Sequence, residues 1–457
     1  MERPDRRLPV RARQSGSAAS GTQRRLSWGP VVGFGLVSLA ADVVSDGARP
    51  LAGPLLAQLG ASALIVGLVT GGAEAAAQGL RLIFGPWADR TRRYWTFTLA
   101  GYALTAVCVP LLALAPLIGA AGLVLASVLI IGDRVGKAVR SPAKTVLLAA
   151  AAKPVGRGRA FAVHKSLDLA GALLGPLLVS SVLAATGLIS VALAVLAIPA
   201  AAALFLLVWL RRLVRVPVAG QQPADLPAEV PTSAAPAAES SPPEASPAAD
   251  TAGQPPSLFT GTFILFAVAA FFWSAGLVAF GVISFHLTTA LAVPVAVVPL
   301  LYAGAMGAAA LGALASGVVY DSAGAGVLLA LPVLIAAVPV LALAPGAGLV
   351  LAGVLIWGTA TGIQDSTVKA LIADLVPELR QGTAYGVFAA FEGGGALAGG
   401  ALYGALYDAR PLLIGAVGAL QLAALGVLLV TLRKSRRAWR PGPLSATTRP
   451  RWPRSGR

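Results

Sequence analysis

Ionisable side chains recur at helical spacing inside long apolar stretches of this sequence. A charge near the centre of a bilayer costs about 2.5–3.5 kcal/mol on insertion scales, so such a residue normally faces the interior of a helix bundle, paired or wet. A carboxylate without a fixed partner there can take up and release a proton as its surroundings change. We therefore expect proton coupling or charge relay at Asp42, Asp46, Glu74, Arg134, Asp168 and Glu392.

Some of these charges also have a structural interpretation that the sequence leaves open. Asp42 and Asp46 share a helix face with Arg49 and could form a static ion cluster. Glu74 could pair in the same way with Arg81.

Two further charged stripes lie in the fourth and fifth apolar stretches. Asp133, Lys137 and Arg140 share one helix face, where the basic side chains could be functional or could simply extend to the membrane surface. His164 and Asp168 are spaced i, i+4 near the start of the next stretch. The N-terminal half is thus crowded with charge of both signs, and the C-terminal half is nearly neutral.

Aromatic, amide and acidic side chains in these stretches could line a substrate cavity. Such side chains suit amphipathic or cationic organic solutes. Aromatic residues near helix ends are also common anchors at the membrane interface, which is the alternative for the aromatic candidates. The candidates are Gln78, Trp273, Tyr302, Gln364 and Asp365.

The elements that must hold these side chains are membrane-spanning helices. The chain has 457 residues, is 57% hydrophobic and 12% charged, and has a mean hydropathy of +0.79. Soluble domains are about 25% charged. Stretches long enough to cross about 30 Å as helices recur along the chain. We place them near 28–57, 62–85, 95–115, 117–150, 160–185, 187–210, 258–287, 293–317, 326–345, 347–375, 383–407 and 411–432.

Basic residues cluster at both ends of the chain and in alternate loops, for example in 90–93, 153–159 and 211–215. Because cytoplasmic loops are rich in lysine and arginine, this pattern predicts twelve spans with both termini in the cytoplasm. The same clustering accounts for the net charge of +16, so we expect a lipid bilayer and no nucleic acid as partner.

The predicted organisation has five segments. Residues 216–257 are rich in Pro, Ala, Ser and Glu and cannot bury a core. For residues 1–27, a transit peptide is an alternative to a cytoplasmic tail. The segments are a basic cytoplasmic tail (1–27), an N-terminal six-helix bundle (28–215), a disordered cytoplasmic linker (216–257), a C-terminal six-helix bundle (258–432) and a basic cytoplasmic tail (433–457).

The two halves repeat. With a shift of 224 residues, AFAVHKSLDLAGALLG (160–175) lies over AYGVFAAFEGGGALAG (384–399), with six of sixteen positions identical and Asp168 over Glu392. A shift of 232 places Gly85-x-x-x-Asp89 over Gly317-x-x-x-Asp321. Parallel six-helix repeats around a central cavity are a transporter architecture.

Few residues are available for other chemistry. Cys108 is the only cysteine, and the two histidines, His164 and His286, are far apart in sequence. We therefore expect no disulfide, no metal site and no cofactor. The sequence has no Ser/His/Asp constellation and no Gly-Lys-Ser/Thr nucleotide-binding loop, which argues against an enzyme and against an ATP-driven pump.

Three stretches resemble the major facilitator superfamily. GPWADRTRRYW (85–95) is similar to the signature between its second and third helices, and GVVYDSAGAG (317–326) to the counterpart in its second half. IGDRVGKAVRSPAK (131–144) resembles the end of the fourth helix in a bacterial subgroup, with Lys144 and Thr145 in place of Arg-Asp. The matching residues are Gly85, Asp89, Arg90 and Arg93; Gly317, Asp321 and Gly324; and Asp133, Arg134, Gly136, Lys137, Arg140 and Pro142.

The resemblance implies an all-α polytopic membrane protein of twelve helices in two pseudo-symmetric bundles. It also implies that Asp89, Arg90 and Arg93 latch the two halves together at the cytoplasmic face. Gly171-x-x-x-Gly175-Pro176 partly matches the fifth-helix motif of drug/proton antiporters in this superfamily, although ordinary small-residue helix packing would also explain it.

These observations together favour a monomeric secondary transporter in a bacterial inner membrane that works by alternating access. We expect proton-coupled efflux of small organic molecules, with the direction resting on the partial fifth-helix motif alone. An uptake symporter, and a lipid or lysolipid flippase on the same scaffold, remain alternatives.

Overall fold

The computed structural model describes residues 17–213, 261–376 and 381–438. Within these ranges the chain is helical and forms no β-strand. The predicted linker 216–257 lies outside the described residues, as do the parts of the two predicted tails before residue 17 and after residue 438.

Residues 17–213 form the N-terminal bundle. Helix α1 passes through a short 3-10 turn, η1 (Arg49–Leu51), into α2, so these elements together make the first predicted span. Pro50 suits this turn because its ring fixes φ and it has no N–H group to leave unpaired. The helices are α1 (Ser17–Ala48), α2 (Ala52–Gln58), α3 (Ala63–Gly79), α4 (Arg81–Thr91), α5 (Tyr94–Leu111), α6 (Gly122–Ala151), α7 (Arg157–Thr186), α8 (Ile189–Val195) and α9 (Ala197–Leu213).

The remaining described residues form the C-terminal bundle. Here α10 and α11 together make the seventh predicted span, and a 3-10 turn, η4 (Val295–Val297), precedes α12. The helices are α10 (Gly261–Gly276), α11 (Phe280–Thr289), α12 (Val298–Ala323), α13 (Ala330–Leu341), α14 (Ala347–Leu375), α15 (Gln381–Ala405) and α16 (Arg410–Ala438).

Eleven helical segments of the described chain are long and apolar enough to cross a membrane. They coincide in order with eleven of the predicted stretches. The remaining stretch, near 383–407, forms α15, whose many glycines and Glu392 make it less apolar than the others. The chain is therefore a multi-pass membrane protein.

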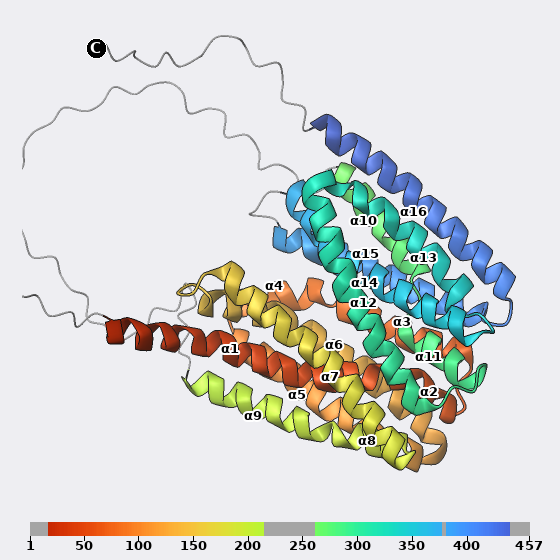
Figure 1. Cartoon of the computed structure of the whole chain (residues 1–457), viewed down its shortest axis with the longest axis horizontal. Helices are drawn as coiled ribbons and strands as arrows, with labels where there is room; N and C mark the ends of the chain where they lie inside the picture. The colour runs from red at the N-terminus through yellow and green to blue at the C-terminus, as the bar shows by residue number, and fades with distance from the viewer. Residues whose placement is uncertain (1–16, 214–260, 377–380, 439–457) are drawn as a thin grey trace, which may run out of the picture.

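The two bundles lie side by side and are joined more closely at one end than at the other (Figure 1). We call one end proximal: it holds the turns near residues 92 and 154 and the described ends at 213, 261, 376 and 381. The opposite end, with the turns near residues 60, 188 and 292, is called distal. The beginning of α1 and the end of α9 lie at the proximal end, on the left of Figure 1.

Glycines bring the two bundles into direct backbone contact. A Cβ atom on Gly67 or Gly71 of α3 would collide with the backbone of Gly400 or its neighbours on α15. At the distal end, a Cβ on Gly53 of α2 would collide with the backbone of α11 at Gly281. The distal contact is completed by Ser180 on α7, whose hydroxyl donates a 2.7 Å hydrogen bond to the carbonyl oxygen of Ala296.

The internal repeat is visible in the packing. Helices α7 and α15 begin at Arg157 and Gln381, which are 224 residues apart. Each places two glycines against the first helix of its own bundle. Gly171 and Gly175 approach the carbonyl groups of Leu39 and Val43, and Gly395 and Gly399 approach those of Phe271 and Ala275. The contacted residues on α1 and α10 are 232 apart, the second shift found in the sequence. The two bundles are therefore built on one plan.

Replacing Gly400 with alanine is expected to lower stability. The new Cβ would meet the carbonyl oxygen of Gly67 and the Cα of Gly71, so α3 and α15 would have to move apart. Overpacking of this kind costs about 1–3 kcal/mol. Gly415→Ala on α16 is the control, because nothing lies within 4 Å of a Cβ at that position. Thermal unfolding in detergent should show a lower melting temperature for Gly400→Ala only, and equal curves for both variants would contradict the close contact.

Candidate functional site

A cavity of about 750 Å³ lies between the two bundles. Helices α1, α3, α4, α5, α6 and α7 of the first bundle line it on one side, and α10, α12, α14 and α15 of the second line it on the other. Its wall reaches Lys144, Ala162 and Lys369 near the proximal ends of their helices. Because the bundles are in contact at the distal end, the cavity occupies the middle and proximal parts of the molecule.

A polar cluster forms the distal floor of the cavity and joins the two bundles. Arg49 forms an ion pair with Glu74 of α3, and its guanidinium lies 3.9 Å from the carboxylate of Asp46. Tyr302 of α12 donates a 3.0 Å hydrogen bond to Asp46 and accepts one of 3.4 Å from Arg49. We call these four residues, Asp46, Arg49, Glu74 and Tyr302, the floor cluster.

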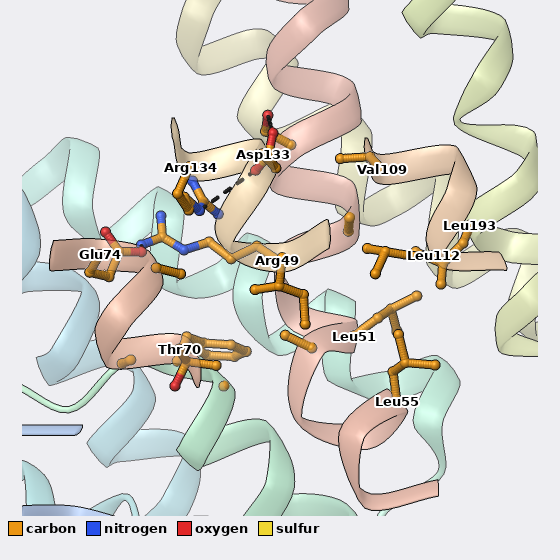
Figure 2. A pocket seen from close by; sticks show the side chains of 18 residues that line it. Arg49, Leu51, Leu55, Thr70, Glu74, Val109, Leu112, Asp133, Arg134 and Leu193 are labelled. Carbon is orange, nitrogen blue, oxygen red and sulfur yellow. Dashed lines mark hydrogen bonds and ion pairs between the residues drawn. The ribbon is translucent and has the colours of Figure 1, made fainter. Parts of the chain in front are cut away.

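Beyond the floor cluster lies a second, much smaller pocket of about 40 Å³. Arg49 and Glu74 line both spaces, so this ion pair separates them. Figure 2 shows Arg49 reaching across the small pocket to Glu74, with Asp133 and Arg134 beside them. Leu51, Leu55, Leu112 and Leu193 enclose the other side of the pocket.

Helix α6 carries the predicted charged stripe, and its members lie in different surroundings. Asp133 accepts a 3.1 Å hydrogen bond from Ser45 and lies 3.6 Å from Nε of Arg134, and both charged side chains are buried. Lys137 lines the main cavity. Arg140 donates a 2.5 Å hydrogen bond to Thr105.

Helix α7 presents a chain of polar contacts beside the cavity. Nδ1 of His164 lies 3.3 Å from the carboxylate of Asp168, and Nε2 lies 3.2 Å from the hydroxyl of Ser38 on α1. Ser38 in turn accepts a 2.8 Å hydrogen bond from Lys144 and lies 3.2 Å from the hydroxyl of Tyr102. Asp168 thus has a histidine partner, and this partner is tied to α1 and α6.

The wall contributed by the C-terminal bundle carries fewer charges. Gln364 of α14 donates a 2.8 Å hydrogen bond to Glu392 of α15, and no basic side chain of the described chain lies within ion-pair distance of Glu392. Asp365 and Lys369 form an exposed pair at 3.4 Å. Among the predicted cavity residues, Gln78, Gln364 and Asp365 line the cavity, as do Asp42, Asp46, Glu74, Asp168 and Glu392 from the predicted charge carriers.

Three predicted residues lie elsewhere. Trp273 is fully buried in the core of the second bundle, where its ring lies 5.6 Å from that of Phe266, because this face of α10 packs inside its own bundle. Tyr302 is also fully buried and closes the floor of the cavity instead of lining it. Arg134 faces the small pocket with Asp133 and does not line the main cavity.

The residues of the predicted latch lie at the proximal turn between α4 and α5. Asp89 accepts a 3.1 Å hydrogen bond from Tyr94 of the same bundle. Arg90 and Arg93 are exposed, and neither has an ion-pair partner among the described residues. Gly85, Gly317 and Asp321 make no interaction with the opposite bundle in the described part of the chain. No latch joins the two halves through these described residues in this state.

Sequence reasoning missed several residues of the site. Ser38, Tyr102 and Thr105 bind the charged side chains of α6 and α7, but hydroxyl groups in apolar helices are too common to single out. Met306 and Trp357 line the cavity without any charge to mark them. Their positions follow from the packing of helices distant in sequence, which spacing does not reveal.

Comparison with known proteins agrees with this architecture. An uncharacterized protein of Mycobacterium tuberculosis is 46% identical over 412 residues, which cover 90% of this chain and 94% of that protein. The structure of the nucleoside transporter NupG matches with a TM-score of 0.65 and 14% identity, covering 89% of this chain and 99% of that chain.

A bacterial homolog of the human lysosomal transporter Spinster, in an inward-facing and unoccupied conformation, matches with a TM-score of 0.58 and 17% identity over 89% of this chain and 95% of that chain. At such identities these structural matches show the fold alone. Residues 34–400 match the Major Facilitator Superfamily, so the chain belongs to that superfamily of membrane transporters of small solutes.

Proposed function

We propose that this chain is a proton-coupled secondary transporter of small organic solutes that works by alternating access. The observation that carries the proposal is the cavity between two related bundles, lined by ionisable side chains and separated from the distal end by the floor cluster. Rocking of the bundles about the cavity would open the distal end and close the proximal one.

We propose that the proximal end is the cytoplasmic one, because the basic loops lie there. Lys153 and Arg159, together with the arginines of 90–93, lie at the proximal turns, where the positive-inside rule places cytoplasmic loops. We propose that α15 is the twelfth span, that both termini are cytoplasmic, and that the protein is a monomer in the inner membrane of a bacterium. The inward-open state would then be the one described above.

Asp42 and Glu392 are the best candidates for the proton carriers. Neither carboxylate has an ion-pair partner among the described residues, and both line the cavity. Asp46 and Glu74 are held by Arg49, Asp168 by His164, and Asp133 by Arg134. A partnered carboxylate is stabilised in its charged form, so these pairs act as charge relays or as structural links.

We further propose efflux as the direction, on the strength of the partial antiporter motif on α7. Gly171 and Gly175 of that motif hold α7 against α1 close to Asp42, because the Cβ of Asp42 lies beside Gly171. Because the motif holds α7 against α1, which carries Asp42, uptake of a proton by Asp42 would be felt by both helices and so by the whole N-terminal bundle. The same proposal assigns Asp89, Arg90 and Arg93 to a latch that forms when the cytoplasmic end closes.

Glu392→Gln is expected to abolish solute-triggered proton movement, because the amide keeps the hydrogen bond to Gln364 but carries no titratable proton. The measurement uses proteoliposomes with a pH-sensitive dye inside and a panel of organic cations, anions, sugars and lysolipids. Asp42→Asn is the second test variant. Asp408→Asn, in the exposed distal turn outside the cavity, is the control and should match the wild type.

Retention of wild-type proton flux in both Glu392→Gln and Asp42→Asn would contradict the assignment of the carriers. Solute movement without any proton movement in the wild-type protein would contradict proton coupling itself and leave a uniporter or a flippase as the better interpretation.

A further inference from the structure

The two walls of the main cavity differ in charge. The first bundle places five basic side chains on the wall besides Arg49, together with the carboxylates of Asp42, Asp46, Glu74 and Asp168. The second bundle contributes one basic side chain, Lys369, already paired with Asp365, and the carboxylate of Glu392. Basic side chains therefore outnumber acidic ones on the first wall but not on the second. Of the five, Arg140 is held by Thr105 and Lys144 by Ser38. The others, Arg81, Lys137 and Lys165, have no hydrogen-bond or ion-pair partner among the described residues.

These three cations come from α4, α6 and α7 and line one cavity together with Asp365 of the opposite wall, and none is within ion-pair distance of that carboxylate. A group bound in the cavity would therefore face positive charge from three helices. Three convergent donors of this kind suit a carboxylate or a phosphate.

Unsatisfied polar atoms belong to residues that line the same cavity. Nε of Arg81 is buried without a hydrogen-bond partner, and so is Oε1 of Gln364 across the cavity. Oδ1 of Asp168 is also buried without a hydrogen bond and has only its 3.3 Å contact with Nδ1 of His164. Buried polar groups nearly always have a partner, so an orphaned donor and an orphaned acceptor on facing walls indicate groups that a bound molecule would satisfy. The buried and unpartnered guanidinium nitrogen favours an anion as that molecule.

One part of the second wall is apolar. Met306, Ala309, Ala310 and Ala313 of α12 line the cavity together with Trp357 of α14. Small side chains leave room beside a large aromatic ring, which suits the apolar body of an organic molecule. The volume of about 750 Å³ is within the range of sites for drug-sized ligands.

We propose that the transported solute is an amphipathic organic anion. Its carboxylate or phosphate binds between Arg81, Lys137 and Lys165 of the first bundle, and its apolar body packs against α12 and Trp357 of the second. This inference rests on the proposed transport function. Of the amphipathic or cationic solutes expected from the sequence, it keeps the amphipathic body and gives it an anionic head group.

The test measures binding to the full-length protein in nanodiscs of neutral phosphatidylcholine by isothermal titration calorimetry. The probes are 4-phenylbutyrate, 4-phenylbutyl phosphate, 4-phenylbutylamine and 4-phenylbutanol, which share one apolar body and differ in the head group. We expect both anions to bind at millimolar concentration or below, at least about tenfold more tightly than the amine and the alcohol. The two anions compared with each other show whether the site prefers carboxylate or phosphate.

Lys165→Gln is expected to weaken anion binding about tenfold, and Lys165→Arg to restore most of it. Arg81→Gln should have a similar effect. Lys153→Gln removes a positive charge from the exposed turn between α6 and α7, outside the cavity, and should bind like the wild type. Lys165 is itself exposed, so its replacement leaves the fold intact.

The inference would be overturned if the amine or the alcohol bound as well as the anions, if no anion bound at millimolar concentration, or if Lys165→Gln and Lys153→Gln behaved alike. These outcomes concern binding alone and are independent of transport. Anion binding without any transport in proteoliposomes would contradict the proposed function and leave the anion site standing. Transport restricted to cations would support the transport function and contradict the anion site.

Discussion

Oxidation of a Ser180→Cys/Ala296→Cys double variant is expected to abolish transport, and reduction is expected to restore it. The hydroxyl of Ser180 on α7 donates a 2.7 Å hydrogen bond to the carbonyl oxygen of Ala296 in the turn before α12, so the two bundles touch at this point of the distal end. Alternating access requires the distal contact to open once in every cycle. A covalent bond across it would hold the protein in the state described here.

The experiment is done in a Cys108→Ser background, because Cys108 is the only native thiol. Transport is measured in proteoliposomes before oxidation with copper–phenanthroline, after oxidation, and after reduction. Ser181→Cys with Ala296→Cys is the matched control: Ser181 is the next residue of α7, but it is exposed and its hydroxyl bonds back to Leu177 of the same helix. Full transport by the cross-linked Ser180 variant would mean that the distal contact never opens during transport.

Arg49→Met is expected to destabilise the protein by about 3 kcal/mol, at the lower end of the cost of breaking a buried ion pair. Without Arg49, the carboxylates of Asp46 and Glu74 would have no basic partner in the floor cluster. The side chains of Arg49 and Glu74 are about three-quarters shielded from solvent, which is why the lower end of the range applies. Adding Glu74→Met should recover most of the loss, because no unpaired carboxylate then remains at that position.

Lys369→Met is the control for this prediction. It breaks the Asp365–Lys369 pair, whose side chains are more than half exposed, and exposed pairs contribute only about 0.2–1 kcal/mol. Unfolding in detergent by heat and by added denaturant gives the comparison. If Arg49→Met and Lys369→Met lowered stability equally, the floor cluster would contribute no more than a surface pair.

Much of the fold follows from the sequence, because apolar runs interrupted by basic turns specify helices and their order. The repeat adds the position of the fifth helix in each bundle, and α7 and α15 begin at residues related by the predicted shift. The break between α1 and α2 was not predicted. Pro50 lies in a tight 3-10 turn that joins the two helices into one span, so the apolar stretch continues through the break.

The site is predicted less completely, because spacing fixes which residues share a helix face but not where that face points. Glu392 and Asp42 line the cavity as expected, since a charge in an apolar helix avoids lipid. An aromatic side chain can lie in lipid, in a cavity or in a core. The sequence therefore does not fix the position of Trp273, which lies in the core of the second bundle. The link from Asp168 through His164 to Ser38 joins residues more than a hundred positions apart, and only the packing of α7 on α1 creates it.

The ion pair between Arg49 and Glu74 separates the small distal pocket from the main cavity, and this position has a consequence for leakage. A guanidinium keeps its positive charge at every physiological pH, so the ion pair with Glu74 does not come apart by titration of Arg49. The carboxylates of Asp46 and Glu74 balance this charge, so the barrier between the two spaces is the paired side chains themselves. As long as the pair is intact, protons and metal cations in the main cavity are held back from the small pocket.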